Sequence, residues 1–163
     1  MFIASTPRRQ SSIRPLWSAA ACLAALGLAL ASVPVQAKQK CTDFTAYADG
    51  DSLPQKLKQD GYLFRFGGPS SIFFGGAQFW SSGASFTTPK PGQWVEVDVF
   101  AGAGFDIELN GLNATGGVEA SATIPTDISL HTVRLVSSGQ PIVKVTLAEG
   151  GNESTLNRVC TRY

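Results

Sequence analysis

The sequence is poor in the residues that carry most enzyme chemistry. Its 163 residues include one histidine, three cysteines and one methionine, and only 15% are charged. It contains no Gly-x-Ser-x-Gly motif, which would mark a serine nucleophile. It also has no run of lysine and arginine, and this argues against nucleic acid or an anionic membrane as the partner. The low charge together with 44% hydrophobic residues argues against disorder.

The first residues have the order of a secretory signal peptide. A start with three arginines precedes an almost wholly apolar run over residues 16–33, and small or short residues follow up to Ala37. This order predicts a signal peptide over residues 1–37 and a secreted or periplasmic domain over residues 38–163. A retained membrane anchor is the alternative, because the apolar run approaches the roughly 20 residues that a spanning helix needs. After cleavage we expect no contact with a membrane.

Residues 38–163 have the size of one domain with a hydrophobic core. They hold all 12 acidic residues and all but three of the 13 basic residues, so their net charge is slightly negative. No internal repeat or linker divides them. We therefore predict a single exported domain.

Two of the three cysteines, Cys41 and Cys160, lie near the two ends of this domain. In an exported protein, two cysteines predict a disulfide bond. Such a bond would stabilise the fold by roughly 4–5 kcal/mol in the chain-entropy model. Free thiols or a metal site are the alternatives, but a zinc site would have only these two sulfurs and His131 as ligands. The disulfide predicts that the first and last segments lie side by side.

Strand patterns dominate the domain. Residues 94–100, WVEVDVF, alternate strictly, with three valines on one face and polar or aromatic residues on the other. The same alternation recurs in three further segments, 105–111, 118–124 and 141–147. Glycine- and proline-rich turns separate these segments. About nine or ten short strands at near-regular spacing predict an all-β fold, an antiparallel β-sandwich or barrel.

Two segments leave the choice between strand and helix open. Residues 53–61, LPQKLKQDG, are compatible with a turn or two of helix. In residues 153–163, ESTLNRVCTRY, apolar residues fall at helical spacing, but the β-branched residues favour a strand. A closing strand beside the opening CTDFTAY strand would also bring Cys41 near Cys160.

Three short stretches add a resemblance to a known class of domains. They are an opening strand with an Asp-Phe pair (CTDFTAYADGDSLP), a glycine-aromatic strand (GYLFRF) and a Gly-Asn-Glu segment before the last strand (GGNESTLNRV). Together they resemble secreted bacterial jelly-roll domains of the galactose-binding-like and carbohydrate-binding-module-like type. The resemblance covers most of the predicted domain in layout and implies a jelly-roll β-sandwich. This fold hosts lectins, enzyme appendages and structural modules.

The aromatic residues concentrate in residues 61–80, which hold seven of the sixteen in the chain. In YLFRF the three aromatics fall on one face of a strand, and this predicts that they fill the core. Phe73 and Phe74 are adjacent, as are Phe79 and Trp80, so one member of each pair faces away from the other. The pattern therefore predicts core packing with one or two aromatics left over.

Trp80 and Trp94 are the aromatics that we expect to be exposed. Trp80 is in phase with polar neighbours, and Trp94 is in phase with Glu96 and Asp98, which are not expected to be buried without partners. An indole beside carboxylates has the chemistry of a sugar site. The ring covers the apolar face of a pyranose, and the carboxylates accept hydrogen bonds from its hydroxyls. An ordinary, partly covered tryptophan at a sheet edge is the alternative.

The carboxylates permit two further interpretations. If residues 94–100 and 105–110 form a hairpin, Asp98 shares a face with Asp106 and Glu108, and an oxygen-rich face of this kind suits Ca²⁺. Two carboxylates about 5–9 Å apart would instead suit a glycosidase. A solvated acidic face is the simplest alternative to both.

These patterns predict an exported, non-catalytic protein that binds an extracellular ligand, with a glycan as the leading candidate. His131 is the only imidazole available as a base, and we expect it to be a surface residue of a strand. A structural or adhesive protein that contacts other extracellular proteins through an apolar patch or a free sheet edge is the second hypothesis. A glycosidase-like hydrolase is the third. No cofactor other than Ca²⁺ is predicted.

Overall fold

The computed structural model describes residues 37–150 and 153–163, which form thirteen β-strands and no helix. None of the described residues therefore belongs to a helix long and apolar enough to cross a membrane. The predicted signal peptide lies, apart from Ala37, outside the described residues. The strands are β1 (Gln39–Asp43), β2 (Ser52–Leu53), β3 (Lys56–Gln59), β4 (Tyr62–Phe66), β5 (Ser70–Phe73), β6 (Gly76–Phe79), β7 (Ala84–Gly92), β8 (Trp94–Ala101), β9 (Ile107–Leu112), β10 (Val118–Ile124), β11 (Ser129–Val136), β12 (Ile142–Glu149) and β13 (Ser154–Arg162).

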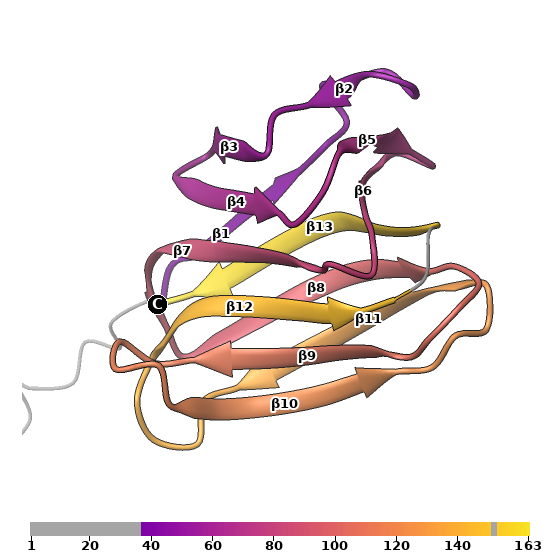
Figure 1. The fold of residues 1–163 in the computed structure, drawn as a ribbon. Coiled ribbons are helices and arrows are strands. Elements are labelled where there is room, and N and C mark those ends of the chain that lie inside the picture. Colours follow the sequence, from indigo (N-terminus) through magenta and orange to yellow (C-terminus); the bar gives the residue numbers. More distant parts are fainter. Residues whose placement is uncertain (1–36, 151–152) are drawn as a thin grey trace, which may run out of the picture. The chain divides into compact units, whose positions relative to one another are not determined.

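The strands form two antiparallel sheets that lie face to face (Figure 1). The seven-stranded sheet has the order β11-β8-β13-β6-β5-β2, with β1 also paired to β13. The six-stranded sheet has the order β10-β9-β12-β7-β4-β3. The predicted antiparallel β-sandwich is therefore confirmed, with more strands than expected. One reason is the segment 53–61, where the structure has the strand β3 and not the turn or two of helix that the sequence also allows.

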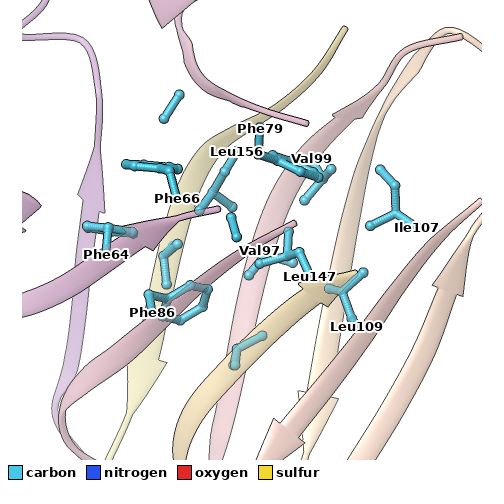
Figure 2. Packing of buried hydrophobic residues seen from close by; sticks show 14 of the residues in the cluster. Phe64, Phe66, Phe79, Phe86, Val97, Val99, Ile107, Leu109, Leu147 and Leu156 are labelled. Carbon is cyan, nitrogen blue, oxygen red and sulfur yellow. The ribbon is translucent and has the colours of Figure 1, made fainter. Parts of the chain in front are cut away.

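The core lies between the sheets and is made by alternate residues of each strand (Figure 2). β4 contributes Tyr62, Phe64 and Phe66, which are all buried, as the YLFRF pattern predicts. β8 contributes its three valines from the other sheet. Burying a side chain of this size stabilises the fold by about 1.5–3 kcal/mol. The same alternation leaves the other residues of each strand on the outer faces.

Tyr62 joins the two sheets through its hydroxyl group. The hydroxyl donates a hydrogen bond to the carbonyl oxygen of Lys40 at 2.7 Å and lies 3.1 Å from Oγ1 of Thr161. Lys40 and Thr161 belong to β1 and β13 of the seven-stranded sheet, whereas Tyr62 belongs to β4 of the six-stranded sheet. Burial raises the pKa of Tyr62, so the hydroxyl remains a donor.

Cys41 and Cys160 form the predicted disulfide, with an S–S distance of 2.05 Å. The two residues lie directly opposite each other in β1 and β13. The C-terminal segment is therefore a strand, as favoured from the sequence, and it pairs with β1, β6 and β8. The bond fastens the opening strand to a strand in the interior of the seven-stranded sheet.

Residues 94–100 and 105–110 do not form the hairpin on which the calcium hypothesis depends. β8 pairs with β11 and β13 in the seven-stranded sheet, whereas β9 pairs with β10 and β12 in the six-stranded sheet. The connection after Ala101 therefore crosses from one sheet to the other. Strict alternation determines which side chains of a strand face the core. It does not determine which strand lies beside it.

Candidate functional site

The outer face of the seven-stranded sheet carries most of the residues that the sequence predicts for a ligand site. In β8, Trp94, Glu96, Asp98 and Phe100 alternate with buried residues and are partly exposed. β11 lies beside β8, and its exposed residues extend this face: Leu130, Thr132, Arg134 and Val136. The expectation that Trp94 shares a face with Glu96 and Asp98 is confirmed by this burial pattern.

Two arginines hold the carboxylates of this face. Arg158 of β13 donates from Nε to Asp98 Oδ2 at 2.6 Å and from Nη2 to Glu96 Oε1 at 3.1 Å. Arg134 of β11 donates from Nη2 and Nε to Glu96 Oε2 at 2.6 and 3.0 Å. Thr132 Oγ1 donates to Asp98 Oδ1 at 2.7 Å. Both carboxylates are therefore paired, and neither offers an open cation site.

This pairing decides the ionisation of Asp98. Burial raises the pKa of Asp98, but hydrogen bonds from Arg158 and Thr132 outweigh it, and the pKa lies below its ordinary value. The hydrogen bond with Asp98 also raises the pKa of the Arg158 guanidinium. A glycosidase needs one carboxyl group with a raised pKa as its general acid. Asp98 has the opposite shift, so it does not suit that role.

Trp94 lies on the predicted face, but its ring is covered on one side. The guanidinium of Arg134 lies 4.5 Å from the ring centroid, which is a cation–π contact. Val136 of β11 and Arg162 of β13 are its direct cross-strand neighbours. A planar ligand can stack on this indole only from the side that Arg134 leaves open.

Trp80 lies far from Trp94. Trp80 directly follows β6, it is partly buried, and its indole N–H donates to the carbonyl oxygen of Pro69. β6 pairs with the beginning of β13, whereas Trp94 lies opposite Arg162 at the end of β13. At about 3.3 Å per residue, these two ends of β13 are about 25 Å apart. The two tryptophans therefore do not form one platform.

An aromatic cluster that we did not predict lies on the same outer face. We call Phe73, Phe74, Phe100 and Leu130 the Phe74 cluster. The ring of Phe74 lies 4.3 Å from that of Phe73 and 5.5 Å from that of Phe100 between centroids. Leu130 is directly opposite Phe100 in the neighbouring strand. Phe74 is 62% exposed and Leu130 59% exposed, so the cluster presents an apolar surface to solvent.

The backbone of Phe74 adopts a conformation that is unfavourable for its residue type. Phe74 and Gly75 form the two-residue turn between β5 and β6, with φ angles of +49° and +67°. Two positive angles are typical of a type I′ turn, which favours asparagine or glycine at its first position. A bulky residue there costs about 1–2 kcal/mol. Asn157 fixes the turn by donating from Nδ2 to the carbonyl oxygen of Phe74 at 2.9 Å.

The predicted calcium ligands are not brought together. Asp98 is paired with Arg158 on the seven-stranded sheet. Asp106 lies before β9 and accepts a hydrogen bond from the backbone N–H of Thr126, and Glu108 is exposed on β9 of the six-stranded sheet. The expectation depends on the hairpin of β8 and β9, which the structure does not contain. Within residues 37–150 and 153–163, no group of three or more His, Cys, Asp or Glu residues could hold a metal ion.

His131 belongs to a strand, as predicted; the strand is β11 at the edge of the sheet, and the residue is only partly exposed. Its Nε2 atom lies 2.8 Å from Asp127 Oδ1 and 2.9 Å from Ser129 Oγ. In a catalytic triad the serine and the carboxylate contact different ring nitrogens. Here both contact Nε2, so the three residues form a local hydrogen-bonded cluster at the start of β11 without the geometry of a triad.

Comparisons with known proteins give similarity to solved structures only. No protein-family model and no curated protein matches the chain. The chain is similar to a mutant of the family 29 carbohydrate-binding module CBM29-2, with 12% identity over 77% of this chain and 92% of that chain and a TM-score of 0.47. It is also similar to the C-terminal family 6 carbohydrate-binding module of LamC, a laminarinase from Zobellia galactanivorans, with 16% identity over 77% of this chain and 100% of that chain and a TM-score of 0.40.

A third similar structure is a family two carbohydrate esterase from Cellvibrio japonicus, with 15% identity over 77% of this chain and 34% of that chain and a TM-score of 0.41. All three TM-scores are below 0.5. The similarities therefore assign neither a family nor a ligand to the chain.

Proposed function

We propose that the protein binds carbohydrate without catalysis, on the outer face of the seven-stranded sheet. The observation that carries this proposal is the exposed ring of Phe74, which is held in an unfavourable backbone conformation against Phe100. Strained residues persist where the surrounding structure fixes them, and they concentrate at functional sites. A phenylalanine at this position contributes little to the core, so its role is to present an aromatic surface.

The surroundings of the Phe74 cluster supply the polar half of a sugar site. Thr132, Asp98 and Arg158 form the next row across the sheet, and the hydroxyl and guanidinium groups there are partly exposed. An aromatic ring covers the apolar face of a pyranose while such groups exchange hydrogen bonds with its hydroxyls. Trp94 and Glu96 lie further along β8, and Trp94 is about 20 Å from Phe100 at about 3.3 Å per residue. A glycan chain lying along β8 would contact Trp94 at one end of the strand and Phe100 at the other.

Affinity electrophoresis against a panel of neutral polysaccharides tests this proposal. Multivalent probes are needed, because single aromatic contacts give weak binding that avidity amplifies. Phe74→Ser should weaken binding about tenfold, and Trp94→Ala about two- to fivefold, because Arg134 already covers one side of the indole. Val118→Ser is the matched control, since Val118 is 60% exposed on β10 of the other sheet. Absence of binding to every polysaccharide, or equal binding by Phe74→Ser and the control, would contradict the proposal.

A second candidate function is contact with other extracellular proteins, or with a second copy of this chain. It is favoured by the exposure of Phe105 and Ile128, at 67% and 70%, in two connections that a hydrogen bond from Thr126 to Asp106 holds together. Sedimentation of the wild type and of a Phe105→Ser, Ile128→Ser double variant separates the two candidates. Self-association that the double variant abolishes, with no response to any glycan, would favour protein contacts.

We also propose that the domain is exported. The disulfide between Cys41 and Cys160 supports this, because such bonds persist in oxidising compartments. N-terminal sequencing of the mature protein recovered from the producing cells tests it, with cleavage expected after Ala37. Recovery of the intact N-terminus, or of reduced Cys41 and Cys160, would contradict it.

A further inference from the structure

The outer face of the six-stranded sheet carries a set of unpaired cations. Strand alternation directs four basic side chains to this face, and we call it the basic face: Lys56, Lys58, Arg65 and Lys144. Lys56 lies directly opposite Arg65, and Lys144 lies opposite Thr87, whose other neighbour is Leu63. None of the four makes an ion pair or side-chain hydrogen bond with the described residues, whereas Arg134 and Arg158 on the other sheet are both paired.

A hollow of about 440 Å³ opens on the basic face beside Arg65. Arg65, Ser85 and Thr146 line it and form one row across β4, β7 and β12, since Ser85 is directly opposite both of the others. Neighbouring strands lie about 4.8 Å apart. Ser82 and Glu149 line the hollow at the ends of the strands. The volume falls in the range of about 300–1,000 Å³ that is usual for small-molecule sites.

Two glycines hold the rim of this hollow in place. The backbone N–H of Gly67 donates to the carbonyl oxygen of Gly83 at 3.0 Å. A Cβ atom on Gly83 would lie 2.4 Å from the carbonyl oxygen of Leu147, and one on Gly67 would lie 2.4 Å from that of Ser82. Only glycine therefore permits the connection between β6 and β7 to close against β12. The shape of the rim is therefore set by backbone contacts and not by side chains.

Four polar side chains that line the hollow have no side-chain partner among the residues that the structure describes. The guanidinium of Arg65, the hydroxyls of Ser85 and Thr146 and the carboxylate of Glu149 make no side-chain hydrogen bonds with the described residues. Guanidinium binds carboxylate or sulfate in a two-pronged geometry. Hydroxyl and carboxylate groups suit the hydroxyls of a sugar ring. These groups together fit a saccharide that bears an anionic substituent.

From this geometry we infer a second carbohydrate site on the basic face, selective for an anionic polysaccharide, in which Arg65 binds a carboxylate or sulfate group. Lys144 lies on one side of Arg65 and Lys56 on the other. Both lysines can contact further charged units of the same polysaccharide. The inference does not depend on ligand binding at the Phe74 cluster, which lies on the opposite sheet.

Two features favour a polysaccharide over a nucleic acid on this face. Single-stranded nucleic acids stack their bases on aromatic side chains. The described outward positions of β3, β4, β7, β9, β10 and β12 hold no aromatic residue. Glu149 at the rim can accept hydrogen bonds, and a polysaccharide offers hydroxyl donors along its whole length, whereas the phosphodiester backbone of DNA offers none. Lysines on the edge strand β3 do protect an edge from pairing with another sheet. That explanation does not extend to Arg65 and Lys144, which lie on interior strands.

Binding to three polymers tests the inference with the full chain. Polygalacturonate presents carboxylates, dextran sulfate presents sulfates, and unmodified dextran is uncharged. Arg65→Gln should weaken binding to one or both charged polymers by about tenfold, and Lys144→Gln should weaken it less. Lys38→Gln is the matched control, because it removes the same charge from an exposed residue before β1 and should change binding less than about twofold. The polymer that binds more tightly distinguishes a carboxylate from a sulfate.

Several results would overturn the inference. They are equal losses for Arg65→Gln and Lys38→Gln, no binding to either charged polymer, and tighter binding to single-stranded DNA or to vesicles with anionic lipid. Thermal unfolding checks that Arg65→Gln remains folded, as expected for an exposed side chain. Binding of neutral glycans by this variant should equal that of the wild type, so failure at this site is distinguishable from failure at the Phe74 cluster.

Discussion

Phe74 packs against Phe100 with ring centroids 5.5 Å apart and ring planes at 57°. The contact spans β13, which lies between β8 and β6 in the seven-stranded sheet. The contact therefore holds the side chain of Phe74 over the outer face of the seven-stranded sheet. Asp98 and Arg158 form the next row of residues on that face. The exposed ring and the backbone strain belong to the same residue, so one substitution at Phe74 removes both.

Phe74→Asn should relieve the backbone strain and remove the ring. Asparagine tolerates positive φ angles, and 62% of the phenylalanine is exposed, so little buried surface is lost. We expect the free energy of unfolding, measured in urea, to stay unchanged or to rise by up to about 1 kcal/mol. Binding of neutral glycan should fall at the same time. A stability loss greater than about 1 kcal/mol would instead show that the ring serves mainly in packing.

Removal of the disulfide should destabilise the domain strongly. Cys41 and Cys160 are 119 positions apart, so their bond restricts nearly the whole unfolded chain. The double variant Cys41→Ser, Cys160→Ser should lose roughly 4–5 kcal/mol of unfolding free energy in urea denaturation. The wild type unfolded in the presence of a reductant should give the same value. Equal stability with and without reductant would show that the bond restrains little.

Asp98 should contribute to acid sensitivity. Its pKa is lowered in the folded protein, so its stabilising effect is present above the unfolded pKa of about 3.9 and is lost as the pH falls through the folded value. The free energy of unfolding should fall below about pH 4, and Asp98→Asn should show a shallower fall. Asp43, Glu119 and Asp127 also have lowered pKa values and will maintain part of the slope. Identical pH profiles for the variant and the wild type would contradict the expectation.

Tyr62→Phe should weaken the link between the sheets. The change removes the buried hydrogen bond to the carbonyl oxygen of Lys40 and the contact with Thr161. We expect a loss of about 1 kcal/mol in unfolding free energy, and more if these acceptors remain unsatisfied. Tyr47→Phe is the control, because the hydroxyl of Tyr47 makes no hydrogen bond with the described residues. A loss no larger than that of the control would show that the link contributes nothing.

Local pattern in the sequence predicts the faces of the strands well. The alternation in WVEVDVF is sufficient to place Trp94, Glu96 and Asp98 on an outer face, because the side-chain period of a strand is fixed. This alternation does not predict which strands lie beside β8. For that reason the two arginines that pair with Glu96 and Asp98, and the separation of Asp106 from Asp98, depend on tertiary structure.

The two sites that we propose were harder to predict, for different reasons. FFGG signals a turn, but nothing in it indicates that a phenylalanine takes the position with positive φ. The basic face joins Lys56 and Arg65 with Lys144, far along the chain, and only the pairing of β7 with β4 and β12 brings them together. The spacing of these residues in the sequence does not predict that they are neighbours on one face.

The bond between Cys41 and Cys160 has a mechanical consequence. Lys38 and Tyr163 exchange backbone hydrogen bonds next to it, so the start of β1 and the end of β13 lie side by side at one end of the sheet. Tension applied between the two chain ends therefore reaches the covalent crosslink after the rupture of only a few hydrogen bonds. The remaining strands bear no load from such a pull, so the two proposed binding surfaces stay intact as long as the disulfide holds.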